Sequence, residues 1–132
     1  MKIKIPLTYL FALALGSLLA ASFARASDGD KANAKPKATK VSIAAGSLEE
    51  VCVRLKAKEK LRYEFSATAK LQFSIHYHDG DKVEFPVAEH LTASETDLFT
   101  ASAPQTYCLM WENIGTEPVE LKLQHQKWNA SM

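Results

Sequence analysis

Hydrophobic and polar residues alternate with a period of two along most of the chain after residue 40. Such alternation predicts β-strands with one buried face, because successive side chains of a strand point to opposite faces. The predicted strands are short and cover residues 41–43, 51–55, 61–65, 71–77, 83–87, 107–111 and 119–123. Turn-forming residues separate them, above all Asp79-Gly80 and the segment 113–118.

These segments predict an all-β fold, namely an antiparallel two-sheet β-sandwich of about seven to eight short strands, similar to a jelly roll. The stretch 88–100 leaves two alternatives, a loop that carries one helical turn or an irregular edge strand. Pro86 has no N–H group for a sheet ladder, so its strand is expected at a sheet edge or with a bulge.

The first 26 residues have the pattern of a cleavable secretory signal peptide. Lys2 and Lys4 precede an apolar stretch, which ends in the small-x-small cleavage pattern Ala24-Arg25-Ala26. The apolar stretch is close in length to a short spanning helix, so an uncleaved membrane anchor is the alternative. We expect a periplasmic or secreted protein with no membrane span after cleavage.

The chain beyond the signal peptide has the size of one ordinary domain, about 106 residues. Residues 27–40 predict a flexible polar leader, residues 41–126 the β-sandwich domain, and residues 127–132 a C-terminal tail. Three of the 16 basic residues belong to the signal peptide, so 13 basic and 15 acidic side chains remain, a net charge of about −2. That balance argues against a nucleic-acid partner, which requires a clustered basic face.

The chain contains two cysteines, Cys52 and Cys108. In an oxidising compartment an isolated pair most simply forms a disulfide. The closed loop of about 57 residues implies a stabilisation of about 4 kcal/mol in the chain-entropy description. Both cysteines alternate with large apolar residues, so we expect the disulfide on the outer face of the sheet. A redox-active or metal-binding thiol pair is the alternative, although no C-x-x-C spacing supports it.

The strongest local candidate for chemistry is the pair of histidines in His76-x-His78. Residues i and i+2 of a strand share a face, so both imidazoles can reach one metal ion. His90, Met110 and His125 are further candidate ligands, and such a set suits copper or zinc. The alternative interpretation is that both histidines serve as ordinary hydrophilic residues on the outer face of their strand.

Motifs that would indicate an enzyme are missing. The chain has no G-x-S-x-G elbow, no H-E-x-x-H helix and no glycine-rich phosphate loop. The distance from His78 to Glu84 does not match the spacing of a cupin site. We therefore expect no enzymatic activity and no cofactor, and a small cupin-like or hydrolytic enzyme is the least favoured alternative.

Three short segments resemble the GOLD (Golgi-dynamics) domain family over residues 41–125. They are Val51-Cys52-Val53, Asp79-Gly80-Asp81-Lys82-Val83, and Thr106-Tyr107-Cys108-Leu109 followed by Trp111-Glu112-Asn113. The resemblance implies a β-sandwich in which Cys52 pairs with Cys108, and a protein- or lipid-interaction module rather than an enzyme. The coiled coil, membrane helix and cytosolic tail of cargo receptors have no counterpart here, so we do not expect a trafficking role.

Export, size and the missing catalytic motifs together favour a non-enzymatic binding or accessory module. Its expected partner is another protein, bound at an exposed sheet edge near Pro86 or at residues 88–104. A periplasmic copper- or zinc-binding protein is the alternative from a different class.

Overall fold

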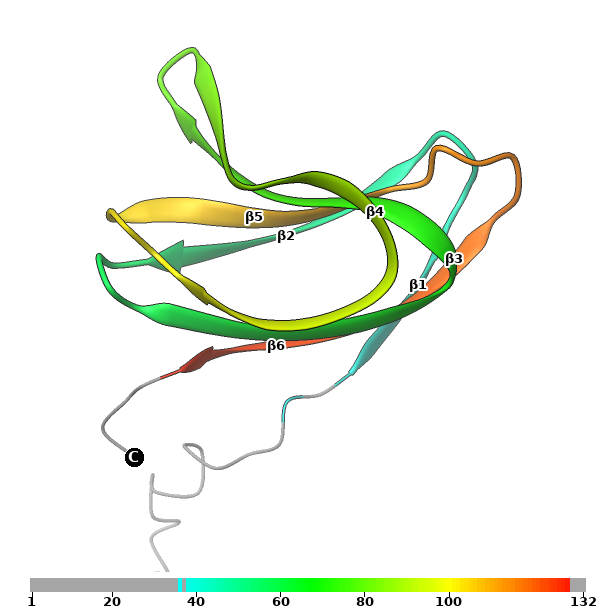
Figure 1. Cartoon of the computed structure of the whole chain (residues 1–132), viewed down its shortest axis with the longest axis horizontal. Helices are drawn as coiled ribbons and strands as arrows, with labels where there is room; N and C mark the ends of the chain where they lie inside the picture. The colour runs from blue at the N-terminus through cyan, green and yellow to red at the C-terminus, as the bar shows by residue number, and fades with distance from the viewer. Residues whose placement is uncertain (1–35, 37, 129–132) are drawn as a thin grey trace, which may run out of the picture. The chain divides into compact units, whose positions relative to one another are not determined.

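The computed structural model describes residues 36 and 38–128, and its regular secondary structure there is entirely β (Figure 1). Six strands follow one another along the chain: β1 (Thr39–Ile43), β2 (Leu48–Leu55), β3 (Lys60–Asp79), β4 (Lys82–Thr100), β5 (Gln105–Glu112) and β6 (Val119–Trp128). The all-β prediction is confirmed. Over the same residues, no helix has the length and apolar character needed to span a membrane. The predicted signal peptide, most of the predicted leader and residues 129–132 of the predicted tail lie outside the described residues.

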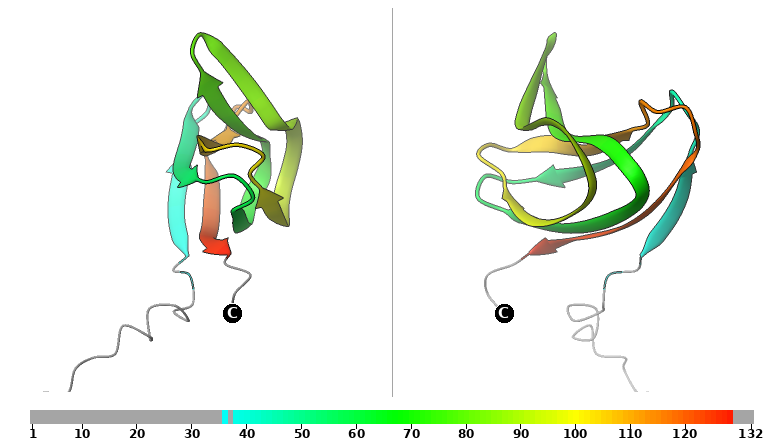
Figure 2. Two further views of the ribbon diagram at one scale, coloured as in Figure 1. Left: turned by 90° about the vertical axis from the view of Figure 1, so that its left-hand side faces the viewer. Right: turned by 45° about the vertical axis from the view of Figure 1, so that its right-hand side comes forward.

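The strands form one antiparallel sheet that curls around its own core, as Figure 2 shows from two sides. The strand order is β1-β6-β3-β5-β2, and β4 also pairs with β3. Strand β3 pairs with β6 over residues 60–67 and with β5 over residues 72–76, while β4 follows it along both parts. The long strands β3 and β4 therefore carry the sheet from one side of the core to the other.

The predicted number of strands is wrong. The segments 61–65 and 71–77 belong to one strand of 20 residues, and 83–87 and 88–100 belong to one strand of 19 residues. The residues between the first two segments, 66–70, contain neither glycine nor proline, and β3 bends there at a register shift instead of turning back. Of the two alternatives for 88–100, the irregular edge strand is the one observed.

Two local predictions about the β3–β4 hairpin are confirmed. Asp79 pairs with Lys82 across a two-residue loop, and Gly80 has a φ of 61°, which glycine adopts without steric cost. Strand β4 has β3 as its partner along one side, and its register shifts at Pro86, where two residues face one residue of β3. A proline fits there because a bulged edge strand does not require its missing N–H.

Alternate residues of each strand point into the core. Phe73 is fully buried and lies at the centre of an aromatic cluster, with ring centroids 4.7 Å from Phe65, 5.4 Å from Tyr63 and 5.4 Å from Trp111. Leucines and isoleucines complete this core: Leu55, Leu61, Leu71, Ile75, Leu109, Leu121, Leu123 and Ile43. The period of two therefore assigns the buried face correctly in β2, β3, β5 and β6, but not at residues 83–87 of β4, where Val83 and Phe85 are exposed and a register shift separates them from Val87.

Candidate functional site

The chemically richest part of the outer face spans β2, β5 and β3. Cys52 pairs with Cys108, and Cys108 pairs with His76, so the three residues form one row across the sheet. The next row, two residues away on each strand, consists of Glu50, Met110 and Ser74. Directly paired residues of antiparallel strands project their side chains from the same face, so all six lie together. We call Cys52, Cys108, His76 and Glu50 the disulfide cluster.

The disulfide lies on the outer face, as the alternation predicts. Cys52 and Cys108 are bonded, with their Cα atoms 4.0 Å apart. Tyr107 and Leu109, on either side of Cys108, are both fully buried in the core. Cys52 is exposed to solvent, whereas Cys108 is buried by its neighbours on the outer face. Of the two cysteines, Cys52 is therefore the more accessible to an attacking thiol.

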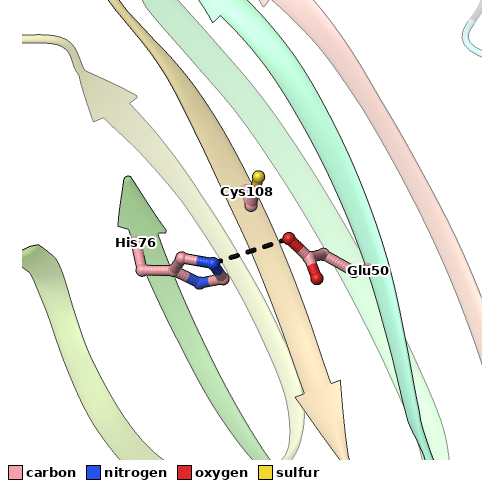
Figure 3. A group of neighbouring side chains, drawn as sticks. All are labelled: Glu50, His76 and Cys108. Carbon is pink, nitrogen blue, oxygen red and sulfur yellow. Dashed lines mark ion pairs between the residues drawn. The ribbon is translucent and has the colours of Figure 1, made fainter. Parts of the chain in front are cut away.

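Glu50 joins His76 to the disulfide (Figure 3). Its Oε1 atom lies 3.5 Å from Nε2 of His76 and 3.3 Å from Sγ of Cys52. Donor atoms of Glu50, His76 and Cys108 all lie within 4.8 Å of one another. Figure 3 shows the three side chains converging from β2, β3 and β5. Zinc binds histidine nitrogen, carboxylate oxygen and thiolate sulfur in proteins, but the sulfur of Cys108 is joined to that of Cys52 in the disulfide.

The His76 side chain is enclosed although it lies on the outer face. It is 5% exposed, and its ring packs against those of His78 and Phe85, with centroids 5.3 Å and 5.7 Å away. Its Nδ1 atom has no hydrogen-bond partner among the described residues, and neither has Oγ of buried Ser74. Buried polar atoms are normally paired, so two unpaired ones on this part of the sheet point to a functional role.

The five metal-ligand candidates from the sequence do not converge on one point. His76, His78 and Met110 share the outer face of the sheet. His90 packs edge-on against the core residue Phe73, with ring centroids 5.7 Å apart, so it belongs to the opposite face. His125 is directly paired with buried Tyr63 on that same inner face. The two distant histidines therefore cannot complete a site at His76.

Sequence reasoning missed Glu50, although a signal for it was present. Glu50 stands two residues before Cys52 in the same strand, so it had to share a face with that cysteine. Its approach to His76 depends on the pairing of β2, β5 and β3, which no local pattern reveals.

A second group of polar side chains lies on the inner face at the edge of the core. Nδ1 of His90 donates a hydrogen bond to the carbonyl oxygen of Ala88 (2.8 Å), and Nε2 lies 3.1 Å from Oε1 of Glu95. Burial, together with the charges of Glu95 and Asp97, raises the pKa of the Tyr63 hydroxyl. Tyr63 therefore remains neutral across the physiological range and is suited to a structural role.

The two histidines of the inner face are expected to titrate in opposite directions from the ordinary value of 6.5. The Ala88 carbonyl and then Glu95 raise the pKa of His90, while burial lowers the pKa of His125. His90 therefore contributes stability that is present below pH 6.5 and is lost as the pH rises through its folded pKa. His125 lowers stability as the pH falls below 6.5, since the unfolded chain binds its proton first.

An NMR titration of the imidazole ring protons tests this expectation. The His90 midpoint should lie above 6.5 and the His125 midpoint below it. Glu95→Gln should move the His90 midpoint downwards and leave that of His125 in place. The assignment of causes is contradicted if Glu95→Gln shifts both midpoints equally, or if His125 takes up its proton at a higher pH than His90.

Comparisons with known proteins assign no family to this chain. No family model and no curated protein matches this chain. A de novo designed double-stranded β-helix is similar at 20% identity and a TM-score of 0.42, covering 68% of this chain and 99% of the design. A protein of known crystal structure from Sulfurospirillum deleyianum is similar at 12% identity and a TM-score of 0.40, covering 70% and 99% of the two chains.

Proposed function

We propose that this protein is an exported, non-enzymatic binding module that holds a partner protein along the free edge of β4. The observation that carries the proposal is the concentration of exposed apolar side chains on this strand. Val83, Phe85, Leu91 and Leu98 are each between 41% and 54% exposed, and all four belong to β4. Single exposed apolar residues are ordinary, but a row of them along one edge is typical of an interaction surface.

The backbone of β4 supports the same proposal. Within the described part of the chain, β4 pairs with β3 along one side and with no strand along the other. An edge strand presents unpaired N–H and C=O groups, to which an extended segment of another protein can add as a further strand. The apolar side chains along β4 would then favour a segment whose own apolar side chains can pack against them.

The charge of β4 indicates which kind of partner segment it would bind. Its exposed acidic residues Glu84, Glu89 and Asp97 outnumber its basic residue, Lys82. Acidic edges attract basic segments and repel acidic ones. We therefore infer a partner that offers an extended segment with alternating apolar and basic side chains.

Export rests on two observations. The segment that ends in Ala24-Arg25-Ala26 has the pattern of a signal peptide, and the disulfide is of the kind that persists in an oxidising compartment. The GOLD-like interaction module remains the class that we propose. In that description, the two parts of the curled sheet on either side of the core would be the two layers of a β-sandwich.

The other two candidate functions have less support. A copper or zinc site built on His76 and His78 in the oxidised protein lacks the help of His90 and His125, which lie on the inner face. A cupin-like or hydrolytic enzyme has no motif in its favour. Neither candidate therefore displaces the binding module as the proposed function.

Photo-crosslinking tests the proposed edge. A photoreactive residue at position 85 should capture a partner from the exported proteins of the source cells, whereas one at the equally exposed position 48 on β2 should not. With the purified partner, Phe85→Asp and Leu91→Asp should each weaken binding by about tenfold or more, because each removes a buried apolar contact. Leu48→Asp is the matched control, since Leu48 is 51% exposed.

Two outcomes would overturn the proposal. One is equal capture of the same proteins from positions 48 and 85, which would indicate non-specific contact. The other is a concentration-dependent dimer that Phe85→Asp abolishes, which would assign the edge to a second copy of this chain. Circular dichroism of each variant shows that a loss of binding is not a loss of fold.

A further inference from the structure

The disulfide cluster has the composition of a metal site that is closed by a bond between two of its ligands. We propose that reduction of the Cys52–Cys108 disulfide turns the cluster into a zinc site with the ligands Cys52, Cys108, His76 and Glu50. None of these residues belongs to β4, although the ring of Phe85 on that strand packs against His76.

The two distances from Glu50 to its neighbours in the cluster already fit a zinc ion. Four ligands arranged tetrahedrally at about 2.0–2.3 Å from zinc lie about 3.3–3.8 Å from one another. Oε1 of Glu50 lies 3.5 Å from Nε2 of His76 and 3.3 Å from Sγ of Cys52. The carboxylate therefore needs little movement, and the main change is the separation of the two sulfurs once their bond is broken.

The backbone of the site is held in place by the sheet. Cys52, Cys108 and His76 occupy paired positions on β2, β5 and β3, and Glu50 lies two residues from Cys52. The ladder hydrogen bonds of three neighbouring strands fix these positions whether or not the disulfide is present. A site built on rigid strands loses little entropy when the metal binds.

His76 provides the second observation in favour of a ligand. The side chain is enclosed, its Nε2 faces Glu50, and its Nδ1 has no hydrogen-bond partner among the described residues. A zinc ion at Nε2 would leave Nδ1 unpaired, so the observation that favours a ligand is the enclosed Nε2, which lies 3.5 Å from Oε1 of Glu50. His78 on the same strand is exposed and packs against His76.

The opening reaction is thiol–disulfide exchange with a dithiol protein as reductant. A thiolate of the reductant attacks Sγ of Cys52, the more exposed cysteine, the S–S bond breaks, and Cys108 leaves as a thiolate that takes up a proton. The second thiol of the reductant then attacks the mixed disulfide and releases Cys52, so the reductant ends as a disulfide. Zinc replaces the two thiol protons, because the thiolate is the metal ligand.

Cobalt and zinc titrations of the purified protein, with and without a phosphine reductant, test the proposal. Reduced protein should bind one Co²⁺ per chain with the near-ultraviolet charge-transfer band of thiolate ligation, and Zn²⁺ should displace it. Oxidised protein should lack the band and bind Zn²⁺ at least about 100-fold more weakly. The Cys52→Ser/Cys108→Ser double variant should lack the band under both conditions.

Variants of the other two ligands separate the site from adventitious thiol binding. Glu50→Gln should weaken zinc binding by about tenfold or more, and it leaves the fold intact because Glu50 is exposed. His76→Gln should weaken binding at least as much. His125→Gln, on the opposite face of the sheet, is the matched control and should change the affinity by less than about twofold.

Three outcomes would overturn the proposal. The first is equal zinc affinity of the oxidised and reduced protein. The second is a reduced protein whose binding is unchanged by Glu50→Gln, since thiols alone would then account for it. The third is a reduced protein that is unfolded by circular dichroism and does not regain its β-sheet when zinc is added.

Discussion

Replacing Phe73 by alanine is expected to lower the free energy of unfolding by about 3–5 kcal/mol, far more than any substitution on the surface of the sheet. Phe73 is fully buried, and its ring packs against Tyr63, Phe65 and Trp111 from β3 and β5. Removing the ring loses the favourable free energy of its transfer from water to the core. It also leaves a cavity that the four surrounding aromatic residues, including His90, cannot readily fill. Urea denaturation followed by tryptophan fluorescence measures the change.

Phe85→Ala is the matched control, because it removes the same ring from an exposed site. Phe85 is 42% exposed on β4, and we expect a loss below about 1 kcal/mol. Equal effects of the two substitutions would contradict the position of the aromatic core. The same control shows that the proposed binding edge can be altered without loss of the fold.

Removing the disulfide is expected to lower the free energy of unfolding by about 4 kcal/mol. The bond closes a loop between residues 56 positions apart and so restricts the unfolded chain. Without the bond, the unfolded chain gains conformational entropy, and unfolding becomes more favourable. The Cys52→Ala/Cys108→Ala variant and the reduced wild-type protein should show the same loss in metal-free buffer. Urea denaturation of both, beside the oxidised protein, provides the comparison.

A domain of this size has a total stability of about 5–10 kcal/mol, so the reduced protein should remain folded at room temperature. That expectation is a condition of the proposed zinc site, which requires an ordered sheet around two free thiols. Zinc added to the reduced wild-type protein should restore part of the lost stability, since a ligand that binds only the folded state stabilises it. The double alanine variant should gain nothing from zinc, and a loss below about 1 kcal/mol on reduction would contradict the chain-entropy account.

Most of the fold was predictable because the alternation of side chains is a local property. A strand with one buried face places every second residue in the core, which assigns Phe73 and Trp111 inward and His76 and Cys108 outward. The division into short strands failed at residues 66–70, where an interruption of small and polar residues marks a bend in β3 and not a turn. Without glycine or proline, such an interruption does not distinguish the two.

The candidate site was predictable only in part. The disulfide and its outer face follow from the cysteine count and the period of two, and His76 was already a candidate ligand. The chosen companions His90 and His125 lie on the inner face, whereas Glu50 lies beside His76. Bulges in β4 and the pairing of distant strands decide those positions, and neither has a signature in a short stretch of sequence.

By itself, therefore, the sequence determined the β-character of the chain, the buried face of most strands and the pairing of its two cysteines. These features depend on nearest neighbours along a strand and on the presence of a single possible partner for each thiol. Only the tertiary structure decided that Glu50, 26 positions before His76, lies 3.5 Å from it. Strand order and register arise from burying all the apolar faces at once, and that requirement belongs to the whole chain.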